Sequence, residues 1–301
     1  MDTGGNKSSL SELATVATVL RGHVLGPRRG VLVLGLDELL EERVEHAIVA
    51  RVDGDAAQMV AKLKWECVGA FALDDSAVGC VGSRGRFAQT GSSLVLETIA
   101  GDLDHPGISG LLRDAVCIDG QICALSLDGR LLRRAAPGQW NVDMDLMLDA
   151  VMHRLGKGQA TLDGLLAASA TGQLYRRAGR RWSLLDTPST AIINGIWQTP
   201  GGRFVACGMG GLLLEGDTQA MRVIEHDFAQ ENFWSICVLE GAAYVASLDH
   251  LYMLPPTGKL ERIDPLDAAT FNNLSATGDT LWSLGGRDVL ELHGGQWHRI
   301  L

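Results

Sequence analysis

The segment FVACGMGGLLL, residues 204–214, contains a pattern that occurs seven times along the chain. A Gly or Ser is followed three positions later by a second anchor and then by an apolar residue, as in Gly208-x-x-Gly211-x-Leu213. The second anchor falls at positions 38, 85, 129, 172, 211, 250 and 286, so successive intervals shorten from 47 to 36 residues. Short apolar segments that repeat about every 40 residues are typical of the blades of a β-propeller.

A second repeated column keeps the same register. It marks the start of the fourth apolar run of a unit, and its members are Trp140, Trp182, Met221, Leu260 and Trp297. The fifth unit, residues 192–225, shows four short runs separated by tight turns, which is the pattern of an antiparallel meander. We therefore predict an all-β, seven-bladed β-propeller of four-stranded antiparallel blades, with a flexible N-terminal tail over residues 1–9 and a single domain over residues 10–301.

The composition of the runs predicts where they lie in a blade. The second run of each unit, such as FVACGM or YVASL, is rich in Ala, Gly, Ser and Cys. Because blades crowd toward the propeller axis, we expect these runs to be the inner strands. In the first unit, DELLEERV at 37–44 aligns with 249–252 and is expected to be a strand. The connection 141–155 is expected to be a surface loop or a short helix, since four apolar residues recur at helical spacing: Met144, Leu148, Val151 and Leu155.

The charge balance excludes some classes of partner. Lys and Arg total 26 against 36 Asp and Glu, which gives a net charge of −10. This balance argues against nucleic acid and favours a basic protein as the partner. No apolar run reaches 18 residues and no signal-peptide pattern is present, so we predict no membrane contact and a cytoplasmic location. The six cysteines lack paired spacing and are expected to be small buried residues in a reducing compartment.

One segment resembles a known group of repeats. In INGIWQTPGGRFVACGMGGLLLEGD, residues 193–217, an apolar-Trp start precedes a Gly-x-Gly-Gly-x-Leu turn. This arrangement is similar to the bacterial propeller repeats of the broad WD40/YVTN-like and BNR-like superfamily. The resemblance covers residues 64–301 and reaches the first unit only through its Gly column. The Trp-Asp dipeptide and the Asp-box are absent, so the resemblance implies a fold and neither a sialidase-like enzyme nor a eukaryotic-type WD40 scaffold.

Motifs for catalysis are missing from the chain. There is no phosphate-binding loop, no nucleophile elbow and no zinc-protease helix, and the eight histidines do not recur in one repeat column. We therefore predict no metal or other cofactor. An Asn does recur before the first run of units five to seven, as Asn194, Asn232 and Asn272. Two interpretations remain open: the amides cap turns, or they form a binding surface at the channel mouth with Trp197 and Trp234.

The meander topology sorts charges between two faces. The turn between strands two and three and the link to the next blade lie on one face, here the linker face, and the other two turns lie on the hairpin face. Acidic residues concentrate on the linker face, at Asp37, Glu38, Asp128, Asp143, Asp145, Asp149, Asp186, Glu225, Asp227, Glu231, Asp249, Asp264 and Asp267. The hairpin face collects Arg134, Arg177, Arg180 and Arg181, flanked by Arg133 and Arg176. An acidic face of this width would attract a basic protein and speed its encounter.

These observations favour a non-catalytic protein-binding propeller that is monomeric when free. Arg outnumbers Lys 21 to 5, as in high-GC bacteria, where such a chain could be an immunity protein that sequesters a basic toxin such as a nuclease. The candidate partner-binding residues are Asp143, Asp145, Asp149, Asn194, Trp197, Asp227, Glu231, Asn232, Trp234, Asp249, His250 and Asn272. Two alternatives stay open: a metal-dependent, lactonase-like hydrolase with its site in the central channel, and an assembly scaffold that uses the blade edges.

Overall fold

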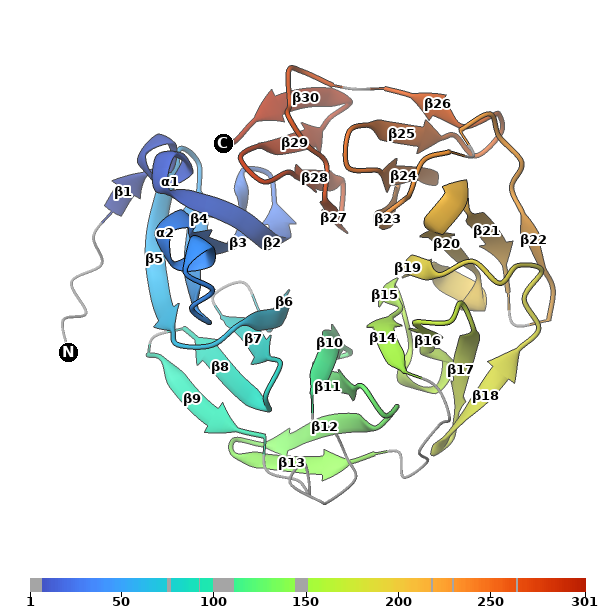
Figure 1. The fold of residues 1–301 in the computed structure, drawn as a ribbon, viewed down its shortest axis with the longest axis horizontal. Helices are drawn as coiled ribbons and strands as arrows, with labels where there is room; N and C mark the ends of the chain where they lie inside the picture. The colour runs from blue at the N-terminus through green and yellow to red at the C-terminus, as the bar shows by residue number, and fades with distance from the viewer. Residues whose placement is uncertain are drawn as a thin grey trace.

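Seven β-sheets stand around a central axis and form a closed ring (Figure 1). The computed structural model describes residues 7–74, 77–91, 93–99, 111–143, 151–217, 219–228, 230–263 and 265–301. Each sheet is one blade, which confirms the predicted seven-bladed propeller of four-stranded antiparallel blades. Blades one and five each carry a fifth strand at one edge. No helix in the described ranges is long and apolar enough to cross a bilayer.

The blades follow one another along the chain. Blade one contains β1 (Lys7–Ser9), β2 (Ala17–Gly26), β3 (Arg29–Leu36), β4 (Ala47–Asp53) and β5 (Ala56–Leu63), with helices α1 (Leu10–Val16) and α2 (Asp37–Glu41). Blade two contains β6 (Cys67–Ala72), β7 (Val78–Gly82), β8 (Arg86–Thr90) and β9 (Val95–Thr98). Blade three contains β10 (Leu112–Ile118), β11 (Gln121–Ser126), β12 (Leu131–Ala136) and β13 (Gln139–Val142). Blade four contains β14 (Met152–Leu155), β16 (Leu166–Ser169), β17 (Leu174–Ala178) and β18 (Arg181–Leu185).

The last three blades complete the ring. Blade five contains β15 (Lys157–Gly158), β19 (Ile193–Gln198), β20 (Phe204–Gly208), β21 (Leu213–Gly216) and β22 (Met221–Val223). Blade six contains β23 (Ser235–Leu239), β24 (Ala242–Ala246), β25 (Leu251–Leu254) and β26 (Glu261–Arg262). Blade seven contains β27 (Asn273–Thr277), β28 (Thr280–Leu284), β29 (Val289–His293) and β30 (Gln296–Arg299). Single 3-10 turns lie at Leu162–Gly164, Pro200–Gly202 and Met209–Gly211.

The first strand of each four-stranded meander, and not the second, lines the channel (Figure 1). These strands are β2, β6, β10, β14, β19, β23 and β27. The prediction that the small-residue runs are the innermost strands is therefore wrong, since these runs form the strand next to the innermost one. The second strands are instead covered by neighbouring blades on both sides, and β7 and β28 are buried at every residue. At Gly30 on β3, a Cβ atom would lie 2.4 Å from the Trp282 ring of blade seven. Small residues are thus required because the second strands are the most tightly covered ones.

The turn between the second and third strands explains the repeated Gly column. Gly85, Gly129, Gly172 and Gly211 all have positive φ there, which a side chain would disfavour. Blade one has helix α2 at this turn, so the prediction of a strand over 37–44 is wrong. Leu and Glu favour helix, and acidic residues in the first turn, here Asp37, suit its positive end.

The N-terminal segment also differs from the prediction. Residues 7–9 were expected to belong to a flexible tail, but they form β1 and pair antiparallel with residues 56–58 of β5. This pairing covers the outer edge of blade one. Around the ring the described cysteines are all free, and five of the six are buried, as the sequence predicted.

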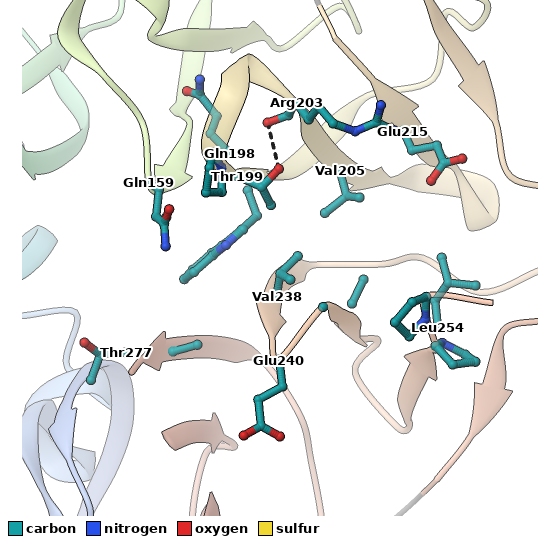
Figure 2. A pocket seen from close by; sticks show the side chains of 18 of the residues that line it. Gln159, Gln198, Thr199, Arg203, Val205, Glu215, Val238, Glu240, Leu254 and Thr277 are labelled. Carbon is teal, nitrogen blue, oxygen red and sulfur yellow. Dashed lines mark hydrogen bonds between the residues drawn. The ribbon is translucent and has the colours of Figure 1, made fainter. Parts of the chain in front are cut away.

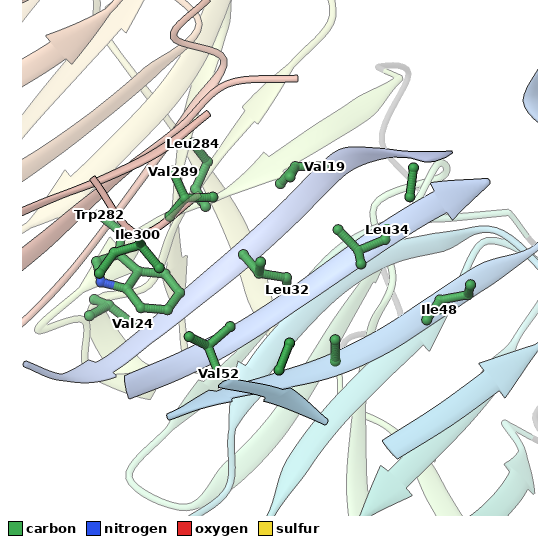
Figure 3. Close-up of a cluster of buried hydrophobic side chains, with 13 residues drawn as sticks. Val19, Val24, Leu32, Leu34, Ile48, Val52, Trp282, Leu284, Val289 and Ile300 are labelled. Carbon is green, nitrogen blue, oxygen red and sulfur yellow. The ribbon is translucent and has the colours of Figure 1, made fainter. Parts of the chain in front are cut away.

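Blades one and seven close the ring without exchanging a strand (Figure 3). Trp282, Leu284 and Val289 of blade seven pack with Val24 and Leu32 of blade one in a single buried cluster. Hydrogen bonds reinforce this contact: the Val19 N–H donates to the Gly286 carbonyl at 2.9 Å. Ring closure therefore depends on side-chain packing and inter-blade hydrogen bonds and not on a shared sheet.

Candidate protein-binding surface

A mixed apolar and acidic surface lies on the linker face at blades five and six. We call it the blade-six patch, and its residues are Asp227, Glu231, Asn232, Trp234, Leu248 and Asp249. Trp234 precedes β23, and the residue is 40% exposed. Its backbone N–H donates to the Ala246 carbonyl at 2.8 Å, which fixes the main chain at this point. Leu248, in the turn between β24 and β25, is 48% exposed. Exposed aromatic and aliphatic side chains ringed by polar ones are typical of interface hot spots.

A rigid layer supports this patch from below. Phe233 and Tyr252 are fully buried, and their ring centroids lie 5.4 Å apart in an edge-to-face arrangement. Phe228 packs on Tyr252 with centroids 4.8 Å apart. His226 hydrogen-bonds through Nε2 to the Gly211 carbonyl at 2.6 Å, which ties the segment to the blade-five turn. The patch is therefore held in place before any partner arrives, which lowers the entropic cost of binding.

The amide of Asn232 has a structural role within the patch. Its Oδ1 accepts a hydrogen bond from the Gly210 N–H at 2.9 Å, across the junction between blades five and six. Asn194 acts at the same junction: it is buried, and its Nδ2 donates to the Phe233 carbonyl at 2.9 Å. Asn272 is half-buried. These contacts agree with the interpretation that the amides stabilise turns, and the structure does not bring the three side chains to a common ligand site.

The carboxylates of the patch carry uncompensated charge. Asp227 and Asp249 are exposed and Glu231 is half-exposed. Within the described ranges, no ion pair links any of the three to a Lys or Arg. His250 adjoins them, with its ring edge-on to Tyr252. The link and the turn that carry Trp234 and Leu248 therefore also carry an excess of negative charge.

Other predicted binding residues lie elsewhere. Asp143 is only 7% exposed, and its carboxylate accepts from the Arg177 guanidinium at 2.7 Å, so it joins blades three and four and is not a free surface charge. Asp145 and Asp149 lie outside the described residues. Trp197 lies near the end of β19, toward the hairpin face, and is thus separated from Trp234 at the start of β23.

The predicted segregation of charge between the faces is weaker than expected. Arg134 pairs with Glu97 of blade two, and Arg177 pairs with Asp143, so both guanidinium groups hold neighbouring blades together. On the linker face, hydrogen bonds from Thr18 and Arg287 hold the pKa of Asp37 below its ordinary value, and the Arg287 cation offsets its charge. Part of the acidity of the linker face is therefore offset within the protein, at Asp37 and Asp143, whereas the carboxylates of the blade-six patch are in no such pair in the described ranges.

The hairpin face carries a groove of about 730 Å³ between blades five and six (Figure 2). Trp197, Val205, Val238 and Leu254 supply its apolar wall, and Arg203, Glu215 and Glu240 lie around it. Trp197 was singled out from the sequence, but the groove was not, because its walls come from turns of different blades. In the described part of the chain no three His, Cys, Asp or Glu side chains gather closely enough to hold a metal ion.

One bacterial protein is similar to this chain along most of its length. No protein-family model matches the chain. The chain is similar to the Immune protein Tsi7 of Pseudomonas aeruginosa, with 29% identity over 281 residues that cover 88% of this chain and 90% of that protein.

Solved structures with the same architecture are more distant in sequence. A catalytically inactive virginiamycin B lyase from Staphylococcus aureus superimposes with a TM-score of 0.73 at 10% identity, covering 95% of this chain and 97% of that chain. YCF48 bound to D1 peptide gives 0.71 at 15% identity, covering 97% of each chain. The WD40 propeller domain of Doa1 gives 0.65 at 13% identity, covering 98% of this chain and 96% of that domain. These structures share the β-propeller fold with this chain.

Proposed function

We propose that this chain is an immunity protein that binds a toxin and neutralises it, with the blade-six patch as the centre of the contact. The observation that carries the proposal is the similarity to an immune protein along nearly the whole propeller, at 29% identity over 88% of the chain. A similarity of that extent includes the faces of the disc as well as its core. The proposal requires binding only, and no chemistry from the propeller itself.

The composition of the patch favours a basic toxin. Trp234 and Leu248 offer apolar area that a partner can bury, and Asp227, Glu231 and Asp249 surround them. Charge complementarity of this kind raises the association rate and rejects acidic proteins. A toxin that acts on nucleic acid needs a basic substrate site, so an acidic patch that covers it would block the substrate by occupying the same surface.

The test combines growth and binding. The candidate toxin for the test is the product of a gene adjacent to the one for this chain, expressed alone and together with the propeller. Expression of the toxin alone arrests growth, co-expression restores it, and the two proteins form a 1:1 complex. Failure of the chain to rescue growth or bind that toxin overturns the proposed function.

Paired variants test the position of the contact. Trp234→Ala is expected to weaken binding roughly 30-fold, since a hot-spot residue contributes 2 kcal/mol or more. Its control is Leu184→Ala, which removes a side chain that is 59% exposed on the outer strand of blade four. Asp249→Asn should slow association and reduce its salt dependence, whereas Asp119→Asn on the hairpin face should do neither. Equal losses from the patch and control variants, with rescue intact, would place the contact elsewhere on the propeller.

A further inference from the structure

A ring of equivalent positions on the first strands connects neighbouring blades. Five of these strands carry a β-bulge at the same place, and the residues that follow it are Arg21, Gly69, Asp114, Arg154 and Gly195. Ser235 and Ser275 make the same kind of contact from blades six and seven, each accepting a hydrogen bond from a backbone N–H of the next blade. We call these seven residues the inner ring.

Two members of the inner ring are cations fixed by the next blade. Arg21 donates through Nε to the Cys67 carbonyl at 3.3 Å, and Arg154 donates through Nε to the Asn194 carbonyl at 2.9 Å. Backbone carbonyls accept from one donor of Arg21 and from two of Arg154, whose Nη1 also donates to the His153 carbonyl at 3.5 Å, but they supply no compensating negative charge. Both guanidinium groups therefore bring a full positive charge to the channel wall.

A third cation enters the channel on an added segment. Strand β15 lies on the inner side of blade five and pairs in parallel with β19, with Lys157 opposite Trp197 (Figure 1). Gly158 follows Lys157 with a φ of 79°, and a Cβ there would lie 2.5 Å from the Gln198 carbonyl oxygen. This glycine lets the segment approach β19 closely, and the approach carries the Lys157 side chain toward the axis.

Only one carboxylate balances these cations in the described part of the chain. Asp114, a member of the inner ring, is 1% exposed, and its two oxygens accept from the Ala115 and Leu155 N–H groups at 2.9 and 3.0 Å. Asp114 acts to raise the pKa of Lys157, but burial and the nearby Arg21 and Arg154 cations together lower it below the ordinary value. Three cations against one carboxylate leave a net excess of two positive charges in an otherwise acidic protein.

Space for a ligand lies next to Lys157. A cavity of about 220 Å³ in the channel is lined by Lys157, His23, Cys117 and Ser275. It shares Gly158 and Trp197 with the larger groove on the hairpin face, which therefore adjoins it. One water molecule occupies roughly 30 Å³ of liquid, so the cavity has room for a small polyatomic ion together with some of its water.

We propose that the central channel binds a small dianionic oxyanion of the phosphate class at Lys157, which lines the cavity, while the nearby Arg21 and Arg154 supply further positive charge from outside its lining. A charge of −2 matches the excess of the three cations over Asp114. The guanidinium groups retain N–H donors for anion oxygens, and the Lys157 ammonium has three. The bound anion offsets the mutual repulsion of cations from blades one, four and five and so stabilises the ring. This inference does not depend on the identity of the toxin.

The test measures phosphate binding and thermal stability on the full chain, in buffer free of phosphate and sulfate. Titration calorimetry with inorganic phosphate is expected to give a 1:1 complex, and phosphate should raise Tm more than sodium chloride at equal ionic strength. Lys157→Met is expected to weaken phosphate binding at least tenfold, whereas Lys259→Met, which removes an exposed cation in blade six, should leave it unchanged.

The stability of the Lys157→Met variant gives a second readout. Without phosphate its Tm should equal or exceed that of the unaltered protein, because a repelling cation is gone. With phosphate the order should reverse. The proposal is overturned if phosphate does not bind at millimolar concentration, if chloride or acetate acts as strongly as phosphate, or if Lys157→Met binds phosphate as well as the Lys259→Met control does.

Discussion

Glu291 joins the two ends of the propeller, and its replacement gives a sharp test of how the ring is closed. The side chain is 1% exposed on β29. Its Oε2 accepts from the backbone N–H of Arg28 in blade one at 2.6 Å and from the Trp282 indole N–H at 2.9 Å. Glu291→Ala leaves both donors without this acceptor at the junction, whereas Glu291→Gln keeps a carbonyl oxygen that can accept both hydrogen bonds.

The structure sets the size of the two effects. A buried donor that loses its acceptor costs about 1–3 kcal/mol. The Trp282 indole N–H is such a donor, whereas the Arg28 bond is only partly buried. Glu291→Ala should therefore lower the free energy of unfolding by about 1–3 kcal/mol or somewhat more. Glu291→Gln loses only the assistance that the charge gives to two hydrogen bonds, and it also removes a buried charge, so we expect a loss of about 1 kcal/mol or less. Against a total stability of about 5–15 kcal/mol, the alanine effect is large.

Urea unfolding followed by tryptophan fluorescence measures both variants, with Glu261→Ala as a control at an exposed site on β26. Amide hydrogen exchange then locates the effect, since loss of the junction should raise exchange in β2 and β28 before other blades. An alanine variant within about 0.5 kcal/mol of the unaltered protein would refute this account of ring closure. So would a glutamine variant as unstable as the alanine one.

Two further outcomes follow from the channel. Gly158→Ala should lower Tm clearly more than Gly179→Ala in a thermal melt. Both glycines have positive φ, but an added Cβ at 158 would lie 2.5 Å from the Gln198 carbonyl oxygen, whereas one at 179 would face open space. Equal shifts would contradict the close approach of β15 to β19. Burial, aided by the Lys157 cation, lowers the pKa of His23 to about 4, below its value of 6.5 when unfolded. The unfolded chain thus binds more protons between these values, so in phosphate-free buffer stability should fall as pH drops from 6.5 toward 4, by up to about 1.4 kcal/mol per pH unit. His23→Gln should flatten this part of the urea-unfolding profile, and an unchanged slope would contradict the assignment.

Much of the blade architecture follows from local sequence. The Gly column at 85, 129, 172 and 211 fixes turns that need positive φ, and the small-residue runs mark the tightly covered second strands. Blade one departs from the repeat by one residue. Val19, directly before the bulge of β2, pairs with Leu34, so Leu34 takes the place that the first Gly or Ser of the repeat takes in other blades. The sequence pattern had put this place at Gly35. Helix α2 occupies the turn that follows and removes the need for glycine there.

The candidate surface was only partly visible in the sequence. Trp234, Asp227, Glu231 and Asp249 were found, because exposed loops follow from the meander pattern. Leu248 was missed, since a single Leu in an apolar repeat does not reveal whether it faces solvent. Asp143 shows the reverse error: its position in a link suggested an exposed charge, but Arg177, which lies in a different blade, buries it.

The sequence by itself determined the number of blades, the order of their strands and the excess of acidic charge, because each depends on residues close together in the chain or on their totals. Only the tertiary structure decided which charges remain free. Arg134 and Arg177 reach carboxylates about 35 residues away, and Arg21, Asp114 and Arg154 occupy one ring position although their residue types differ. Pairing of charges across blades depends on how the sheets pack around the axis. The repeat keeps the backbone geometry of that packing the same from blade to blade, but the side chains at equivalent positions differ.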